Sequence, residues 1–438
     1  MRKYLALAFI QVLILAGCGG GGGGSGSGGS SGGSSGGGGQ VIATAGPPNV
    51  EPIIVDQGPA ALQNANLTAV NVAYVSVTVC VPGSTTSCQT VDHIQVDTGS
   101  SGLRILASAL TITLPPVFDA SNNPMAECLP FADGSSWGSL ATADFKLPTS
   151  GESAASVNVQ IIGDPNFENA RPNGTNNPSN NNCPLPSEDT VPTFGANGIL
   201  GMGPFAQDCG DFCVSMIPSI PMYYGCPTPV SAATCAAETA TLAQQITNPV
   251  TLLATDNNGV IVELPAVGTA GTTTVSGSLV FGIGTQSSNN NALASGVTVL
   301  TADPNAAYIT ANYSDLSNTA YTHSYFDSGS NGVFVVDALS AINTCPSPEQ
   351  GFYCPTSTLN FTGSVTGMNS ASASTPFSVA DAQTQFNNGS FAAFSNLGGT
   401  NSDSLSLDLG LAFFYGRNVY TAVEGATVGG NAGPFYAF

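Results

Sequence analysis

The chain has 438 residues, of which 42% are hydrophobic and only 8% are charged. Lys and Arg number 6 against 27 Asp and Glu, which gives a formal net charge of −21. This composition excludes the highly charged kind of intrinsic disorder, and it argues against a nucleic-acid partner, because phosphate binding needs clustered Lys and Arg. The 53 glycines, with many Ser, Thr and Asn residues, favour an all-β chain of many short strands.

The first 18 residues have the pattern of an export signal. Arg2 and Lys3 form a positive region, and an apolar stretch follows that is too short for a stable membrane span. It ends on Leu15-Ala16-Gly17-Cys18, which resembles a bacterial lipobox. We therefore predict that Cys18 is lipidated and anchors the mature chain, the alternative being an ordinary secretory leader. Gly19, where an Asp would suggest inner-membrane retention, favours the outer membrane, with the body facing the periplasm or the cell surface.

The next segment separates this leader from the folded body. Residues 19–39 contain only Gly and Ser, a composition typical of a flexible tether. We predict a tether over residues 19–45, an N-terminal β lobe over residues 46–248 and a C-terminal β lobe over residues 249–438. We expect the protein to be a monomer.

Ten cysteines remain when Cys18 is set aside, and an even number in an exported body predicts disulfides. Sequence alone leaves their connectivity open. Four pairs are close enough in sequence to staple local loops, which would leave Cys128 and Cys183 as a long-range pair. The four are Cys80/Cys88, Cys209/Cys213, Cys226/Cys235 and Cys345/Cys354. A zinc site is the competing interpretation, but the chain has no CxxC pair and only 2 histidines, so we predict no metal.

The most informative feature is a pseudo-repeat. The segment Val96-Asp97-Thr98-Gly99-Ser100-Ser101-Gly102-Leu103-Arg104-Ile105 is matched by Phe326-Asp327-Ser328-Gly329-Ser330-Asn331-Gly332-Val333-Phe334-Val335. Each copy follows a strand-like run, so each is predicted to form a strand, a tight turn and a second strand. One copy alone would most simply be a β-turn. Two copies with matching flanks indicate a duplicated lobe.

This pair resembles the two catalytic motifs of pepsin-like aspartic proteases, and further segments resemble that family in the same order. Phe131-Ala132-Asp133-Gly134-Ser135 is similar to the flap hairpin, with Trp137 nearby. Gly198–Gly203 and Leu409-Gly410 are similar to the segments that cross beneath the Asp loops. The resemblance implies an all-β, bilobal, pepsin-like acid protease fold with two lobes related by a pseudo-twofold axis. Other short segments, such as Asn248-Pro249-Val250, resemble the sequences of a bacterial lipoprotein family of undetermined function.

The resemblance also implies roles for residues in the two motifs. Asp97 and Asp327 would form a catalytic dyad that shares one proton, because two close carboxylates cannot both ionise. Six residues would support the dyad. The hydroxyls of Ser100 and Ser330 would bond the outer carboxylate oxygens, Thr98 and Ser328 would interlock the loops, and Gly99 and Gly329 would allow close backbone approach.

Three residues depart from the family pattern. Phe131 stands where the flap usually has Tyr, and Trp137 is a candidate to replace the lost ring packing or hydrogen bond. Arg104 stands where Trp is usual, and Asp408 stands where an aliphatic residue is usual. The two histidines, His93 and His323, each precede an Asp by four residues, and we interpret them as matching surface positions because four residues of strand span about 13 Å.

We therefore predict an exported, membrane-tethered aspartic endopeptidase that hydrolyses extended peptides or proteins with an activated water and without a cofactor. The alternative is a catalytically inactive fold that binds peptides or glycans in the cell envelope. A third interpretation is a structural envelope protein. The two Asp turns and the serines that follow them favour the endopeptidase, whereas Phe131 and Asp408 favour the inactive binding protein.

Overall fold

The computed structural model describes residues 3–4, 40–131, 134–172, 183, 186–218, 220–287, 292–294, 296–339 and 342–438. Cys18, residues 19–39 of the tether and the flap residue Asp133 lie outside the described residues. The predictions made for them therefore remain predictions.

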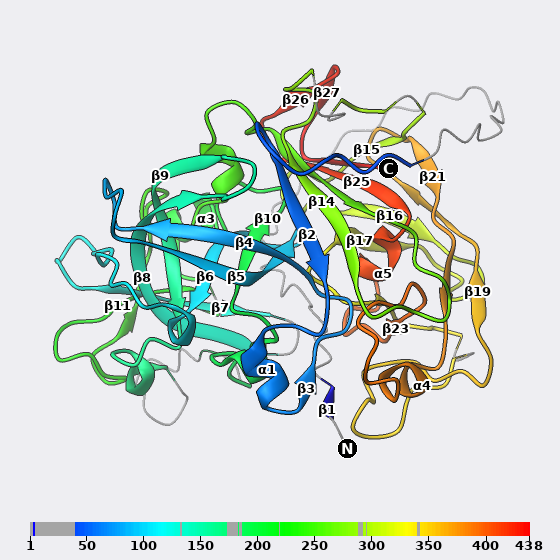
Figure 1. The fold of residues 1–438 in the computed structure, drawn as a ribbon, viewed down its shortest axis with the longest axis horizontal. Helices are drawn as coiled ribbons and strands as arrows, with labels where there is room; N and C mark the ends of the chain where they lie inside the picture. Colours follow the sequence, from blue (N-terminus) through cyan, green and yellow to red (C-terminus); the bar gives the residue numbers. More distant parts are fainter. Residues whose placement is uncertain are drawn as a thin grey trace.

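One large sheet of 15 strands runs through the molecule in the order β12-β11-β7-β8-β9-β6-β10-β5-β4-β2-β14-β13-β25-β28-β15. Strands β4, β5, β8 and β9 lie on one side of the molecule, and β19, β21 and helix α4 on the other (Figure 1). The strands of the large sheet are β2 (Val50–Val55), β4 (Ala73–Cys80), β5 (Cys88–Asp97), β6 (Ser101–Leu106), β7 (Met125–Pro130), β8 (Ser135–Lys146), β9 (Ser153–Ile162), β10 (Gly198–Met202), β11 (Tyr223–Gly225), β12 (Ala236–Ala237), β13 (Gly259–Leu264), β14 (Val275–Phe281), β15 (Val299–Thr301), β25 (Arg417–Ala422) and β28 (Phe435–Ala437).

A second sheet of seven strands belongs to the C-terminal lobe and has the order β21-β20-β16-β17-β24-β18-β23. Its strands are β16 (Ile309–Asn312), β17 (Tyr321–Asp327), β18 (Val333–Val335), β20 (Ser364–Thr366), β21 (Ser372–Ser374), β23 (Gly398–Gly399) and β24 (Leu407–Gly410). Three two-stranded pairs complete the β structure: β1 (Lys3–Tyr4) with β3 (Leu67–Thr68), β19 (Leu359–Phe361) with β22 (Phe377–Val379), and β26 (Thr427–Val428) with β27 (Asn431–Ala432).

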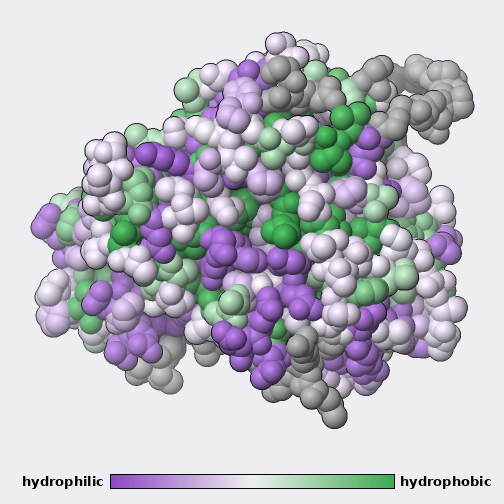
Figure 2. All heavy atoms as spheres, in the orientation of Figure 1, coloured by the Kyte–Doolittle hydropathy of each residue, from purple (hydrophilic) through white to green (hydrophobic). Residues whose placement is uncertain are grey.

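The helices are short. The α-helices are α1 (Ala60–Asn64), α2 (Val191–Phe194), α3 (Asp211–Ser215), α4 (Ala382–Phe386) and α5 (Leu411–Phe414), and three 3-10 helices are η1 (Ala107–Ala109), η2 (Glu168–Ala170) and η3 (Pro249–Leu252). None of the helices in the described part of the chain has the length and hydropathy of a membrane span. On the face drawn in Figure 2, polar and apolar residues are interspersed.

Alternating side chains explain why the strands that carry the site pack as they do. In β4, Val75, Val77 and Val79 are buried, while the residues between them are partly exposed. In β5, Ile94 and Val96 are fully buried directly before the first Asp loop. The period-two burial seen in β4 fixes the register of that strand, since a slip of one residue would turn its apolar side chains outward. The register therefore determines where each Asp loop lies.

The two lobes repeat the same arrangement around each Asp loop. In the N-terminal lobe, β10 runs parallel to β5 and antiparallel to β6, with Gly201 opposite Asp97. In the C-terminal lobe, β24 runs parallel to β17 and antiparallel to β18, with Gly410 opposite Asp327. Each Asp turn thus lies beside its own crossing segment. The all-β, bilobal fold with two related Asp loops is confirmed.

Five disulfides are present among the described residues. They are Cys80–Cys88, Cys128–Cys183, Cys209–Cys213, Cys226–Cys235 and Cys345–Cys354. Four close short loops, and the fifth spans 55 residues, as considered from the sequence. Such a set is typical of proteins that fold in an oxidising compartment.

Candidate active site

The two Asp loops meet and interlock through their second residues. The backbone N–H of Thr98 donates to the Ser328 hydroxyl at 3.1 Å, and the backbone N–H of Ser328 donates to the Thr98 hydroxyl at 2.9 Å. The Ser328 hydroxyl itself donates to the carbonyl of Val96 at 2.8 Å. These bonds join segments 230 residues apart in the sequence. The structure therefore brings the two predicted motifs into one site.

The Asp97 carboxylate is held by its own loop. The backbone N–H of Gly99 donates to Asp97 Oδ1 at 2.7 Å, and the Ser100 hydroxyl donates to Asp97 Oδ2. One oxygen therefore accepts from the backbone of the turn and the other from the serine three positions on. This places the side chain in a fixed orientation at the end of β5.

The Asp327 carboxylate is held in the same way at the end of β17. The backbone N–H of Gly329 donates to Asp327 Oδ1 at 2.7 Å, and the Ser330 hydroxyl donates to Asp327 Oδ2 at 3.0 Å. The loop is also tied to the other lobe, because the side-chain amide of Gln95 donates to the carbonyl of Gly329 at 2.8 Å. The Asp327 carboxylate thus has the same kinds of hydrogen-bond partner as the Asp97 carboxylate.

Two glycines allow the carboxylates to converge. A methyl group built on Gly99 would lie 2.5 Å from the Asp327 carboxyl carbon. One built on Gly329 would lie 2.5 Å from Asp97 Oδ1 and 3.0 Å from Asp327 Oδ1. Both carboxylates therefore face one small space, and any side chain at either glycine would fill it.

Burial disfavours the ionised forms of these two acids. Asp97 is 2% exposed and Asp327 is 3% exposed. Within the residues that the structure describes, neither forms an ion pair with Lys, Arg or His. Burial and the neighbouring carboxylates of Asp97 and Asp408 raise the pKa of Asp327 well above its ordinary value. Two adjacent carboxylates that are both buried repel each other strongly if both are ionised.

The predicted flap is the hairpin of β7 and β8. Its tip is closed by a 2.8 Å hydrogen bond from the Phe131 N–H to the carbonyl of Gly134, and Asp133 lies outside the described residues. The Phe131 ring packs edge-on against Phe194, with the ring centroids 5.9 Å apart. A methyl group on Gly134 would lie 2.5 Å from the carbonyl oxygen of Pro186, so the hairpin tip packs closely against a second segment.

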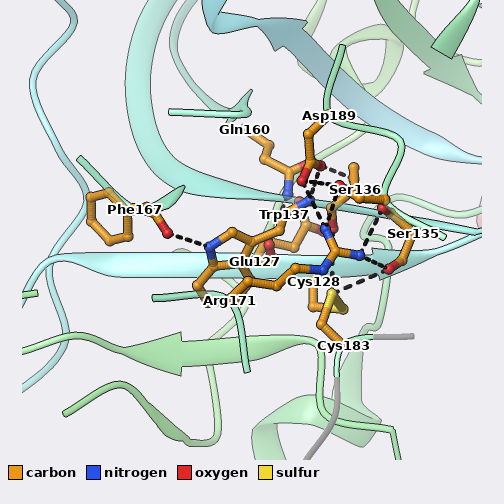
Figure 3. The surroundings of a disulfide bond; sticks show 11 residues. Glu127, Cys128, Ser135, Ser136, Trp137, Gln160, Phe167, Arg171, Cys183 and Asp189 are labelled. Carbon is orange, nitrogen blue, oxygen red and sulfur yellow. Dashed lines mark hydrogen bonds and ion pairs between the residues drawn. A yellow bond between two sulfur atoms is a disulfide. The ribbon is translucent and has the colours of Figure 1, made fainter. Parts of the chain in front are cut away.

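That second segment is fastened to the flap by a cation and a disulfide (Figure 3). Arg171 donates to Asp189 Oδ2 at 2.8 Å and to the carbonyl of Ser135 at 3.1 Å. Beside it, Cys128 of β7 is bonded to Cys183. Both strands of the hairpin are therefore tied to chain outside it.

Trp137 lies in a different apolar cluster from Phe131. Its indole N–H donates to the carbonyl of Phe167 at 2.8 Å (Figure 3). Its ring packs edge-on against Tyr224. The indole N–H of Trp137 is therefore bonded to Phe167 and does not replace the hydroxyl that a flap Tyr would supply. Trp137 is a core residue that supports β8.

Arg104 has partners that sequence reasoning missed. It is fully buried on β6 and contacts Glu127 through two hydrogen bonds, of 3.1 and 2.7 Å, and Asp208 through a third, of 2.8 Å. It also donates to the carbonyl of Ser101 at 2.8 Å. Because Glu127 lies on β7, the network connects the first Asp loop to the flap. The signal in the sequence was an Arg inside an apolar segment of a chain that has only 6 Lys and Arg residues. Nothing in the sequence indicated which acids it would contact.

The two histidines lie near the surface and do not contact the aspartates that follow them. His93 Nε2 is 3.4 Å from Asp56 Oδ2 and its Nδ1 is 3.2 Å from Asp92 Oδ2, while His323 Nδ1 is 2.8 Å from Asp403 Oδ2. Each histidine therefore pairs with a carboxylate of its own lobe.

No curated protein matches the chain by sequence. Among solved structures, the chain is similar to an aspartic proteinase from Irpex lacteus, at 15% sequence identity and with a TM-score of 0.47, over 90% of this chain and 96% of that chain. Residues 45–438 match the model of a family described as proteins of unknown function, DUF3443, and the chain belongs to that family.

Proposed function

We propose that the protein is an aspartic-type endopeptidase in which Asp97 and Asp327 hydrolyse peptide bonds with an activated water. The observation that carries the proposal is the convergence of two buried carboxylates, each held by a turn N–H and a serine hydroxyl. A turn that served structure alone would not require two acids to face each other, because their mutual repulsion costs stability.

The chemistry follows from one proton shared between two acids. Burial and the Asp97 carboxylate raise the pKa of Asp327, which supports a proton held by the pair. The ionised acid of the pair accepts a proton from the attacking water, while the protonated acid donates a hydrogen bond to the carbonyl oxygen of the scissile bond. The proton taken from the water then passes to the leaving nitrogen. Gly99 and Gly329 keep the space between the acids open for this exchange.

The substrate class that fits is an extended peptide. The β7–β8 hairpin, which resembles a flap in its sequence, would hold a peptide in strand conformation through backbone hydrogen bonds. Phe131 supplies an aromatic ring at the flap without a phenolic hydroxyl, so the flap would contribute packing rather than a hydrogen bond. The alternative function is binding of peptides or glycans without catalysis, and an activity assay distinguishes the two.

We also propose that the protein is exported and anchored through a lipid on Cys18 at the outer membrane. The five disulfides support an oxidising compartment, and the lipobox and Gly/Ser tether of the sequence support the anchor. Cys18→Ser should release the body from the membrane fraction. An unchanged fractionation would contradict the anchor.

The activity is tested by digestion of a library of unstructured peptides from pH 2 to 7. Wild type should cleave, Asp97→Asn and Asp327→Asn should not, and a statine-type transition-state analogue should inhibit. Asp119→Asn is the matched control, since Asp119 also accepts two turn N–H bonds, from Ser121 at 2.8 Å and Asn123 at 2.7 Å. Equal inertness of wild type and both dyad variants would overturn the proposal.

A further inference from the structure

A third carboxyl group lies beside the dyad. Asp408 is on β24, opposite Tyr325 of β17, and two residues later Gly410 lies opposite Asp327. Residues that are opposite in parallel strands, and those two apart along one strand, share a face of the sheet. Asp408 therefore lies on the face that carries Asp327. Its side chain is fully buried.

Asp408 has no well-formed hydrogen bond. Neither carboxylate oxygen has a partner among the described residues. In the described part of the chain, the titratable groups that interact with it are Asp97, Asp327, Tyr325 and Tyr436, and none of these is a cation. Burial, with the nearby Asp97 carboxylate, raises the pKa of Asp408 well above its ordinary value. An ionised acid without donors in such surroundings is strongly disfavoured, which favours the neutral form of Asp408.

Ser330 is the neighbour that gives a neutral Asp408 a role. Its side chain is close enough to moderate the rise in the pKa of Asp408. The Ser330 hydroxyl lies 3.0 Å from Asp327 Oδ2, and a hydroxyl that donates its one hydrogen to Asp327 can only accept from Asp408. A protonated carboxyl has an O–H to give, and a serine hydroxyl has lone pairs to accept it.

The opposite lobe lacks this group. There Ile199 of β10 lies opposite Gln95 of β5, at the register position that Asp408 and Tyr325 occupy in the C-terminal lobe. Ile199 is fully buried and apolar. The two Asp loops, otherwise alike, thus differ in what lies beneath their serines.

We propose that Asp408 is a positioning residue that stays protonated and donates to the Ser330 hydroxyl, which in turn donates to Asp327. The relay polarises Ser330 and strengthens its hydrogen bond to ionised Asp327. It makes the two dyad acids inequivalent, and it lowers the pH at which the dyad takes up its second proton. This inference rests on the proposed function for its catalytic consequence, but the relay itself can be tested without activity.

The catalytic arm is the pH profile of kcat/KM for a cleaved peptide. Asp408→Leu should move the acid limb upward by about one pH unit, the value of one hydrogen bond to a charged group. Asp408→Asn should keep the acid limb of wild type, because its amide also donates to Ser330. Ile199→Leu, the control in the other lobe, should leave the profile unchanged. Identical profiles for wild type and Asp408→Leu would overturn the relay.

The second arm uses thermal unfolding and needs no activity. Because its folded-state pKa is raised, Asp408 gives stability below pH 3.8 that is lost as the pH rises. The melting temperatures of Asp408→Asn and Asp408→Leu should therefore increase relative to wild type from pH 4 to pH 8. A difference that does not vary with pH would show that Asp408 holds no buried proton and would overturn the proposal.

A double-mutant cycle isolates the contact itself. Asp408→Leu and Ser330→Ala should be non-additive in stability at pH 5, because each removes the same interaction. Additive effects would overturn the relay. If wild type proves inert on peptides while the cycle is non-additive, the proposed function fails and the relay stands.

Discussion

Thr98 and Ser328 accept hydrogen bonds from each other's backbone N–H groups, at 2.9 and 3.1 Å respectively, across the contact between the two lobes. Both residues are buried, so each hydroxyl satisfies a donor that would otherwise lose its contact with water. This exchange fixes the relative position of the two Asp loops. The distance between Asp97 and Asp327 therefore depends on two side chains outside the pair of carboxylates.

Replacing Thr98 with Val, which has the same shape, tests this interlock. Thr98→Val leaves the Ser328 N–H without its acceptor, and we expect a loss of about 1–3 kcal/mol in the free energy of unfolding. The measurement is urea unfolding at fixed pH. Thr98→Ser, which keeps the hydroxyl, is the control. Equal midpoints for the Val and Ser variants would contradict the interlock.

The buried network of Arg104 predicts a larger effect. Arg104→Met removes the charge that neutralises Glu127 and leaves two buried acids together, so we expect destabilisation by about 3–5 kcal/mol. Arg104→Met combined with Glu127→Gln should recover part of that loss, since one uncompensated charge is gone. Both are read from denaturant unfolding. If the single variant is as stable as wild type, the network does not stabilise the flap strand.

The Cys128–Cys183 disulfide should contribute more than a short-range one. It closes 55 residues, whereas Cys345–Cys354 closes 9. Chain entropy predicts losses of about 4 and about 2.5 kcal/mol when each pair is replaced by serines. Thermal unfolding of both double variants compares them directly. The opposite order would show that the flap disulfide adds little to the constraint already supplied by Arg171.

The pair of His93 and Asp56 predicts a dependence of stability on pH. Burial alone would lower the pKa of His93, but the carboxylates of Asp56 and Asp92 outweigh it and raise that pKa. Burial alone would raise the pKa of Asp56, but the contact with His93 helps to lower it. The raised His93 pKa gives stability that is lost as the pH rises above 6.5, and the lowered Asp56 pKa gives stability that is lost as the pH falls below 3.8.

His93→Asn should therefore cost most between these limits. Asn suits the backbone there, because His93 has a φ of 49°. We expect a loss of about 1 kcal/mol or less at pH 5.5 and a smaller loss at pH 8, because the pair is partly exposed. The measurement is the melting temperature at both pH values. A loss that is larger at pH 8 would contradict the assignment.

The sequence predicted the parts of the site that local pattern determines. Both Asp turns, the serines three positions on and the crossing glycines are encoded in short segments, and their duplication identified them together. Tertiary partners were not accessible in this way. Arg104 meets Glu127 and Asp208, which lie 23 and 104 residues away, and only strand register brings them together.

Side-chain direction was the other limit. Trp137 lies near the predicted flap in the sequence, but the residue faces the cluster that contains Phe167 and Tyr224. In a strand, one residue of register decides the face on which a side chain lies. Asp408 shows the same point in reverse. The resemblance placed its segment beneath the second Asp loop, but the face on which the Asp408 side chain lies follows from the register of β24 with β17.

The most direct test of the shared proton is the rate of cleavage of one identified peptide from pH 2 to 7, measured beside the affinity of each variant for that peptide. The proposed dyad predicts a bell-shaped kcat/KM for wild type, because one acid must be ionised while the other is protonated. Asp97→Asn and Asp327→Asn should bind the peptide but lose at least about a thousandfold in rate. Cleavage by either Asn variant at the wild-type rate would contradict the dyad, as would binding without cleavage by wild type itself.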